Sequence, residues 1–205
     1  MIEVSGIRLS LDAALPENAG KQVTEVAKSL GVSQHDIKGL TLTRKSVDAR
    51  KKNNVHFTTS FQVMLPEALE RRLLEKAPKG LNVRVAKRYE PLSCPDCSAA
   101  IKANGPRPVV VGLGPAGLFA ALYLARCGLR PLVVERGFDV ERRAADIETF
   151  HETGRLNPDS NIQFGEGGAG TFSDGKLTTN IKNPFAKHVL HWFVDAGAPE
   201  SILVE

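Results

Sequence analysis

The stretch Val109-Val-Val-Gly-Leu-Gly-Pro-Ala-Gly117 decides the fold of the second half of this chain. Its valines predict a buried strand, and its glycines have the spacing of a tight turn between a strand and a helix. The apolar run 118–126 predicts the helix, and Pro131-Leu-Val-Val-Glu135 predicts a second strand. Together these elements predict a βαβ unit of the kind that binds dinucleotides.

Each glycine of this motif has a separate physical task. Gly112 permits the tight turn, Gly114 lets a pyrophosphate approach the backbone, and Gly117 lets the helix pack closely onto the strands. The N-terminus of the helix, which follows the glycines at Pro115 and Ala116, offers the unpaired N–H groups of its first turn and the positive end of the helix dipole to phosphate groups. We therefore predict that these five residues bind the pyrophosphate side of a cofactor.

An acidic residue completes the motif. Glu135 stands at the end of the second predicted strand, about 20 residues after the glycines, where a carboxylate accepts hydrogen bonds from a ribose diol. The alternative is an ordinary βα turn with chance glycines, and the strand–turn–helix context argues against it. The motif by itself fits NAD as well as FAD.

A second glycine-rich segment separates these two cofactors. It reads Asn161-Ile-Gln-Phe-Gly-Glu-Gly-Gly-Ala-Gly-Thr-Phe-Ser-Asp-Gly-Lys-Leu-Thr-Thr179. Its bare backbone and many donors suit a planar ring or a pyrophosphate at van der Waals distance. The alternative is a flexible surface loop, but regularly placed phenylalanine and leucine anchors argue against it. This block disfavours NAD binding alone.

These motifs also resemble a known family. The run Arg107-Pro-Val-Val-Val-Gly-Leu-Gly-Pro-Ala-Gly-Leu-Phe-Ala-Ala121, with Val134-Glu-Arg-Gly137, resembles the FAD-binding start of glutathione-reductase-like flavoproteins. With residues 161–179 added, the chain is similar to a widespread, mostly bacterial family of FAD-dependent dehydrogenases. Those proteins also carry a small α/β domain before the flavin domain, so the resemblance covers nearly the whole chain. It implies an FAD-binding oxidoreductase.

The resemblance also implies site residues. Arg136 joins Glu135 and the motif glycines in holding the ADP half of FAD, and the loop 165–176 lies near the pyrophosphate and flavin ring. The loop residues expected at the cofactor are Gly165, Gly167, Gly168, Ala169, Gly170, Ser173 and Lys176.

Three cations near these motifs have alternative explanations. A charge from Lys176 at the flavin would stabilise the anionic reduced ring, and the alternative is an exposed loop lysine. Arg142 and Arg143 follow on the next helix within the expected reach of a phosphate, and the alternative is a pair of surface arginines. The catalytic residues themselves are not identified by the sequence.

The second domain is expected to be incomplete. Family members are much longer than this chain, which has 99 residues from Arg107 onward, with two predicted strands of the parallel sheet. A doubly wound sheet needs several parallel strands covered on both faces. We therefore expect a truncated Rossmann-type FAD-binding domain, the N-terminal portion of a longer enzyme.

Residues 1–90 are predicted to form a separate domain. Hydrophobic periodicity places strands at 2–9, 37–49, 55–65 and 83–86, and helices at 17–30 and 66–76. The order β-α-β-β-α-β predicts a ferredoxin-like α/β sandwich with an antiparallel sheet. The predicted fold class is thus α/β, a ferredoxin-like domain followed by an incomplete Rossmann-type domain.

Charge and composition mark the boundary between the two domains. Residues 1–105 carry 17 Lys and Arg against 11 Asp and Glu, whereas residues 106–205 carry 10 against 12. Prolines near residue 106 punctuate the chain. We therefore expect a linker at 91–106 and the second domain at 107–205.

The excess positive charge concentrates around the hairpin of the first domain, at Arg44, Lys45, Arg50, Lys51 and Lys52. This suggests an alternative function, a non-catalytic module that contacts a protein or nucleic-acid partner. RNA-recognition modules stack bases on aromatic side chains of the sheet. Phe57 and Phe61 are the candidates here, without the surrounding pattern of such modules, so nucleic acid is not the favoured partner.

The linker contains Cys94-Pro-Asp-Cys97, which is half of a zinc site or a redox pair. The remaining cysteine, Cys127, falls in the predicted Rossmann helix, so no metal ligands are assigned. A structural turn, a metal site shared with another segment and a redox pair stay open.

Composition is typical of a globular protein, with 42% hydrophobic and 24% charged residues. The N-terminus lacks the pattern of a signal peptide, and no apolar run approaches a membrane span. An odd number of cysteines argues against a secreted disulfide framework. We expect a cytoplasmic protein with a small-molecule substrate, an electron partner and no membrane contact.

Overall fold

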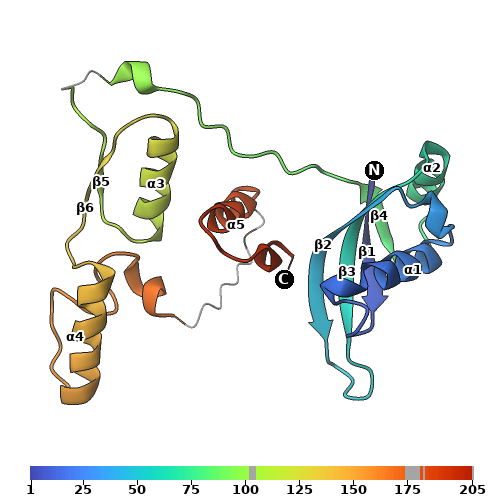
Figure 1. Ribbon diagram of the computed structural model, residues 1–205, viewed down its shortest axis with the longest axis horizontal. Coiled ribbons are helices and arrows are strands. Elements are labelled where there is room, and N and C mark those ends of the chain that lie inside the picture. The colour runs from blue at the N-terminus through green and yellow to red at the C-terminus, as the bar shows by residue number, and fades with distance from the viewer. Residues whose placement is uncertain (102–104, 174–180, 182, 205) are drawn as a thin grey trace. The chain divides into compact units, whose positions relative to one another are not determined.

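The computed structural model describes residues 1–101, 105–173, 181 and 183–204 and divides into two compact units (Figure 1). The first unit contains Met1–Pro91 and Ile181–Glu205, and the second contains Leu92–Asn180. The structure thus groups the C-terminal residues with the first unit, whereas the sequence analysis placed them in the second domain.

The first unit contains a four-stranded antiparallel sheet. Its strands, in spatial order β2-β3-β1-β4, are β1 (Ile2–Leu9), β2 (Gly39–Asp48), β3 (His56–Met64) and β4 (Asn82–Val85). Helix α1 (Ala19–Leu30) joins β1 to β2, and helix α2 (Glu67–Glu75) joins β3 to β4. The mixed α/β class and the antiparallel sheet are therefore confirmed.

The core of this unit lies between the sheet and its two helices. Ile2 and Val4 point into it before the register shift between Ser5 and Ile7, and Ile7 and Leu9 point into it afterwards. Both helices contribute to this same core, through Val26, Leu30 and Leu73. They therefore cover one face of the sheet, as an amphipathic helix requires.

The C-terminal part of this unit contains α5 (Phe185–Asp195) and a short 3-10 helix, Glu200–Leu203. The N–H of Lys45, on the edge strand β2, donates to the Val204 carbonyl at 2.5 Å. The Tyr89 ring stacks on His191 at 3.7 Å between centroids, and the Tyr89 hydroxyl lies 3.0 Å from His188 Nδ1. Both histidines thus pack against Tyr89.

The second unit begins with a βαβ element. Strands β5 (Val109–Val111) and β6 (Leu132–Val134) pair in parallel, with α3 (Pro115–Arg126) between them in sequence. Helix α4 (Val140–Thr153) follows; the Asp139 side chain accepts a hydrogen bond from the Arg142 N–H and caps its start. The predicted parallel pair and the helix between its strands are confirmed.

The two parallel strands are unusually exposed for such a sheet. Within the described residues, Val111 is 82% exposed and Val109 is 59% exposed. Parallel sheets are normally covered on both faces.

No helix in the described part of the chain has the length and apolarity needed to cross a membrane.

Candidate functional site

The turn between β5 and α3 depends on two glycines. Gly112 has a φ of +96°, a left-handed conformation that favours glycine. Its N–H donates to the Val134 carbonyl of the neighbouring strand at 2.7 Å. A Cβ atom at Gly117 would lie 1.9 Å from the Gly112 carbonyl oxygen. The turn itself therefore requires both glycines, Gly112 for its backbone conformation and Gly117 for its packing.

Gly114 is different, because contacts with the described residues do not require it to be glycine. Its φ is −74°, and a Cβ atom there would meet no described atom within 4 Å. It is the N-cap of α3, whose first intrahelical bond runs from the Leu118 N–H to the Gly114 carbonyl, at 2.9 Å. The N–H groups of Ala116 and Gly117 lie in the first turn of α3, before this first intrahelical bond, and such N–H groups bind anions at helix N-termini. The space beside Gly114 is thus open next to a helix N-terminus.

The Glu135 carboxylate ties this turn to the end of β6. Its Oε2 accepts a hydrogen bond from the Leu113 N–H at 2.5 Å, and its Oε1 accepts one from the Gly137 N–H at 3.0 Å. The Gly137 and Leu113 bonds lower the pKa of Glu135 below its ordinary value. The N–H groups of Gly165 and Arg136 also hydrogen-bond this carboxylate and lower its pKa further, so backbone donors from both glycine-rich segments meet at Glu135.

The second glycine-rich segment lies directly against this turn. The Gly167 N–H donates to the Leu113 carbonyl at 2.8 Å. A Cβ atom at Gly168 would lie 3.3 Å from Pro115 Cδ and 3.4 Å from Gly114 Cα. The structure therefore brings together the two segments that the sequence analysis singled out, although 50 or more residues separate them.

Arg143 of α4 binds the backbone of this segment through its guanidinium. Its side chain is fully buried, and its guanidinium donates to the carbonyls of four loop residues. The bonds run from Nε to Asn161 at 3.2 Å, from Nη2 to Ile162 and Gly168 at 3.0 Å each, and from Nη1 to Glu166. A Cβ atom at Gly165 would lie 2.3 Å from Arg143 Cδ. The description of Arg143 as a surface arginine is therefore wrong, and its guanidinium shapes the loop.

The remaining predicted residues lie around this centre. Arg136 lies 3.3 Å from Asp159 Oδ1 and its guanidinium lies 4.6 Å from the centre of the Phe164 ring. Ala169 and Gly170 are exposed on the 3-10 helix Gly168–Phe172, which ends at Ser173. Lys176 lies outside the described residues. Its predicted role at a cofactor stays a prediction.

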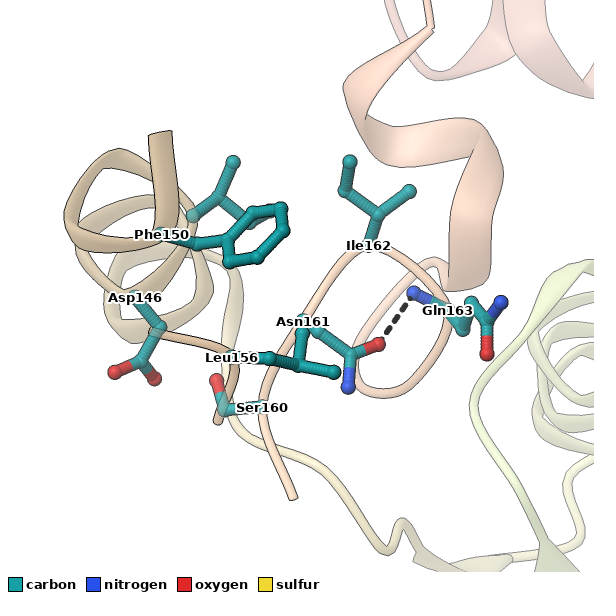
Figure 2. Close-up of a pocket in the computed structure, with 8 residues that line it drawn as sticks. Asp146, Phe150, Leu156, Ser160, Asn161, Ile162 and Gln163 are labelled. Carbon is teal, nitrogen blue, oxygen red and sulfur yellow. Dashed lines mark hydrogen bonds between the residues drawn. The ribbon is translucent and has the colours of Figure 1, made fainter. Parts of the chain in front are cut away.

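An unexpected cavity of about 190 Å³ lies between α4 and the segment that follows it (Figure 2). Phe150 of α4 lines it from one side, and Leu156 and Ile162 of the segment line it from the other. Ser160 is 1% exposed, and its hydroxyl has no hydrogen-bond partner among the described residues. No periodicity in the sequence pointed to this cavity.

The basic hairpin of the first unit contains a matched ion pair. Arg50 donates from Nε and Nη2 to the Asp48 carboxylate at 2.9 and 2.5 Å, and this holds the pKa of Asp48 well below its usual range. Lys45 lies over the Phe57 ring, 5.4 Å from its centre. Phe61 is fully buried in the core. Its ring is thus not available for stacking on a base.

The cysteines of the linker lie next to the end of α3. The Cys97 N–H donates to the Cys127 carbonyl at 2.7 Å. Among the described residues, no group of three or more His, Cys, Asp and Glu side chains is arranged to hold a metal ion. The contact between Cys97 and Cys127 was missed because their sequence spacing of 30 residues carries no pattern.

Two similarities to other proteins bear on the chain. Residues 1–64 match a family described as a domain of unknown function (DUF8436). Over all 205 residues the chain is 44% identical to an uncharacterized protein of Clostridium beijerinckii (strain ATCC 51743 / NCIMB 8052), and it spans 36% of that protein's length. Neither description states an activity, so the argument for a function rests on the site.

Proposed function

We propose that this chain is the N-terminal portion of an FAD-dependent oxidoreductase. The observation that carries the proposal is the contact between the two glycine-rich segments. The Gly167 N–H bonds to Leu113, and Gly168 lies beside Gly114 at the N-terminus of α3. Two stretches of bare backbone thus meet where a helix offers N–H groups to phosphate. An extended dinucleotide with a flat ring system suits such a site.

The topology of both units supports this proposal. The antiparallel order β4-β1-β3-β2 is the order of a ferredoxin-like sandwich. The parallel β5–α3–β6 element has the arrangement expected of the first βαβ unit of a Rossmann-type domain. The exposure of Val109 and Val111 favours a longer protein that covers these strands. The longer Clostridium relative is in keeping with this.

The residues would have separate tasks toward FAD. The N–H groups of Ala116 and Gly117 would bind the pyrophosphate, and Glu135 would accept from the ribose diol while holding the Leu113 N–H. Arg136 and the loop 165–176, with Lys176, would lie toward the remaining part of the cofactor. When bound, FAD would supply hydride transfer to or from a small-molecule substrate. Arg143 would position the loop without touching the cofactor, because its donors are taken by carbonyls.

The proposed setting is cytoplasmic. The free cysteines Cys94, Cys97 and Cys127 agree with a reducing compartment. The substrate and the electron partner would be small or soluble molecules that meet the flavin in the longer protein.

The first experiment is a titration of the purified 205-residue chain with FAD and with ADP, together with an absorbance spectrum. We expect both ligands to bind, because the ADP half is the part that the described site would hold. Gly114→Val should weaken both by at least tenfold, about 1.4 kcal/mol, since the side chain would fill the space beside the helix N-terminus.

The control for this variant is Gly20→Val on α1. A Cβ atom there also meets nothing within 4 Å, but the residue lies in the first unit. Its binding should equal that of the parent chain. A folded parent chain that binds neither FAD nor ADP would contradict the proposal, and so would equal binding by the Gly114→Val variant.

A further inference from the structure

All three cysteines of the chain belong to the second unit, and two of them are in contact. Cys94 and Cys97 lie in the segment before β5, and Cys127 is the C-cap residue of α3. The Cys97 N–H donates to the Cys127 carbonyl at 2.7 Å. With standard bond lengths, this bond places the two Cα atoms roughly 5 to 6 Å apart. Disulfides join Cα atoms that are about 4.4 to 6.8 Å apart.

The contact between the two segments is tight. Gly128 has a φ of +77°, and a Cβ atom there would lie 3.0 Å from Ser98 Cβ and 3.1 Å from Asp96 Oδ1. The Tyr123 hydroxyl of α3 donates to the Ser93 carbonyl at 3.1 Å. The cysteine-containing segment is thus held against the end of α3 at both of its sides.

All three thiols influence the pKa of one hydroxyl group, that of Tyr123. Burial raises the pKa of Tyr123, and the Cys127 thiol raises it further, with smaller contributions from Cys94 and Cys97. Cys127 is 3% exposed, whereas Cys94 and Cys97 are half-buried. The thiols of Cys94 and Cys97 are therefore accessible to a small reagent, and Cys127 is buried.

We propose that Cys97 and Cys127 form a reversible disulfide that fastens the linker segment to the end of α3, and that Cys94 reopens it by exchange. A hydroperoxide is the oxidant. Its oxygen is transferred to the Cys97 thiolate as a sulfenate, and the alcohol or water leaves. The sulfenate takes up a proton from solvent to give a sulfenic acid, the Cys127 thiol attacks its sulfur, the S–O bond breaks as the S–S bond forms, and water is released with the thiol proton.

Reopening uses the third cysteine. The Cys94 thiolate attacks the Cys97 sulfur, a Cys94–Cys97 disulfide forms, and Cys127 leaves as a thiolate that takes up a proton. An external dithiol then reduces the Cys94–Cys97 pair. Cys94 and Cys97 have the C-x-x-C spacing that such exchange uses.

This site is separate from the proposed cofactor site. The glycine turn lies at the N-terminus of α3, and Cys127 lies at its C-terminus, 12 helical residues away. At 1.5 Å of rise per residue, the two ends are about 18 Å apart. The disulfide therefore does not depend on FAD, and it can be tested on the chain without it.

The test is a peptide map of the whole chain after treatment with hydrogen peroxide. Remaining thiols are blocked with N-ethylmaleimide, and the chain is digested without reduction and analysed by mass spectrometry. The chain has three free cysteines, so we expect the blocked thiols to fall from three to one and a Cys97–Cys127 cross-linked peptide to appear. Dithiothreitol should restore all three.

Two variants separate the roles of the cysteines. Cys94→Ser should still form the Cys97–Cys127 disulfide but be reduced more slowly than the parent chain. Cys97→Ser should not form a bond to Cys127 within one chain. A Cys94→Ser chain that forms no Cys97–Cys127 disulfide, or sulfinic acid without a disulfide, would overturn the proposal. Protection of all three thiols by one equivalent of Zn²⁺ in the untreated chain would assign a metal site instead.

Discussion

The buried guanidinium of Arg143 offers the sharpest test of how the glycine-rich loop is held. Replacing Arg143 by Met keeps a long side chain but removes every donor. Four loop carbonyls then lose a partner, and the bonds concern Asn161, Ile162, Glu166 and Gly168. Each bond from a charged donor contributes about 1.5 to 3 kcal/mol to stability.

The net cost is smaller than the sum of these bonds. Removing the guanidinium also removes the desolvation penalty of a charge that is fully buried. Breaking a buried charged network typically costs about 3 to 5 kcal/mol, and we expect a value in that range for Arg143→Met. Since about 1.4 kcal/mol is a factor of ten, the loop should open at least 100-fold more often.

Hydrogen exchange followed by mass spectrometry measures this opening directly. The amides of Glu166 and Gly167, which bond to Phe138 at 3.0 Å and to Leu113 at 2.8 Å, should exchange at least 100-fold faster, as about 3 kcal/mol implies. Amides of β1 and β3 lie in the other unit and should not change. Arg142→Met is the matched control, because Arg142 is exposed and lies over the Phe138 ring. Unchanged exchange of Glu166 and Gly167 in Arg143→Met would refute the idea that this side chain holds the loop.

Three other predictions follow from the same unit. Because the pKa of Glu135 is lowered in the folded state, the ionised carboxylate stabilises the fold fully above its ordinary pKa of about 4.5, and this stabilisation is lost as the pH falls through the pKa of the folded state. The free energy of unfolding measured as a function of pH should show this loss in acid, and Glu135→Gln should flatten that pH dependence. Gly117→Ala should cost at least about 2 kcal/mol in chemical denaturation, because its Cβ would lie 1.9 Å from the Gly112 oxygen. Ser160→Ala should leave the free energy of unfolding unchanged or raise it by up to about 1 kcal/mol, since the buried Ser160 hydroxyl has no partner among the described residues. Its melting temperature should therefore be equal to that of the parent chain or higher. A lower melting temperature for Ser160→Ala would mean that this hydroxyl is bonded in solution.

The elements that sequence analysis located well are those with a local cause. Alternation in 2–9 predicted β1 at Ile2–Leu9 without error, because its inward residues recur with the period of a strand on each side of the register shift between Ser5 and Ile7. Gly31, in the left-handed conformation, ends α1 after Leu30 as a C-terminal glycine does. The predicted helix at 118–126 begins earlier, at Pro115, because proline suits the first turn, where its missing N–H is not needed.

What the sequence did not reveal arises from contacts between distant segments. An arginine in the first turn of a helix is usually exposed, but Arg143, four positions after the N-cap Asp139, is buried because it contacts loop carbonyls that lie 18 or more residues away. The hydrogen bond from Cys97 to Cys127 and the hydrogen bond from Lys45 of β2 to Val204 also join segments that are distant in the sequence. Local patterns report the period of an element and not the identity of its neighbours, so these features required the structure.

The glycines of the second unit show how structural and ligand-related reasons can be separated. Gly117, Gly137 and Gly165 each lack room for a Cβ atom, which would lie within 2.6 Å of a described atom. Packing alone explains these glycines, whether or not a ligand binds. Gly114 and Gly170 have ordinary backbone angles and open space where a Cβ atom would stand.

Open space alone does not identify a ligand site, because Gly20 on α1 has the same two properties. What distinguishes Gly114 is its surroundings: the first turn of α3 on one side and Gly168 of the second glycine-rich segment on the other. A side chain at Gly114 would meet no described atom and would occupy the space beside the N–H groups of the first turn of α3, where a phosphate would bind. The proposed cofactor therefore stands or falls with this residue more than with the glycines that shape the turn.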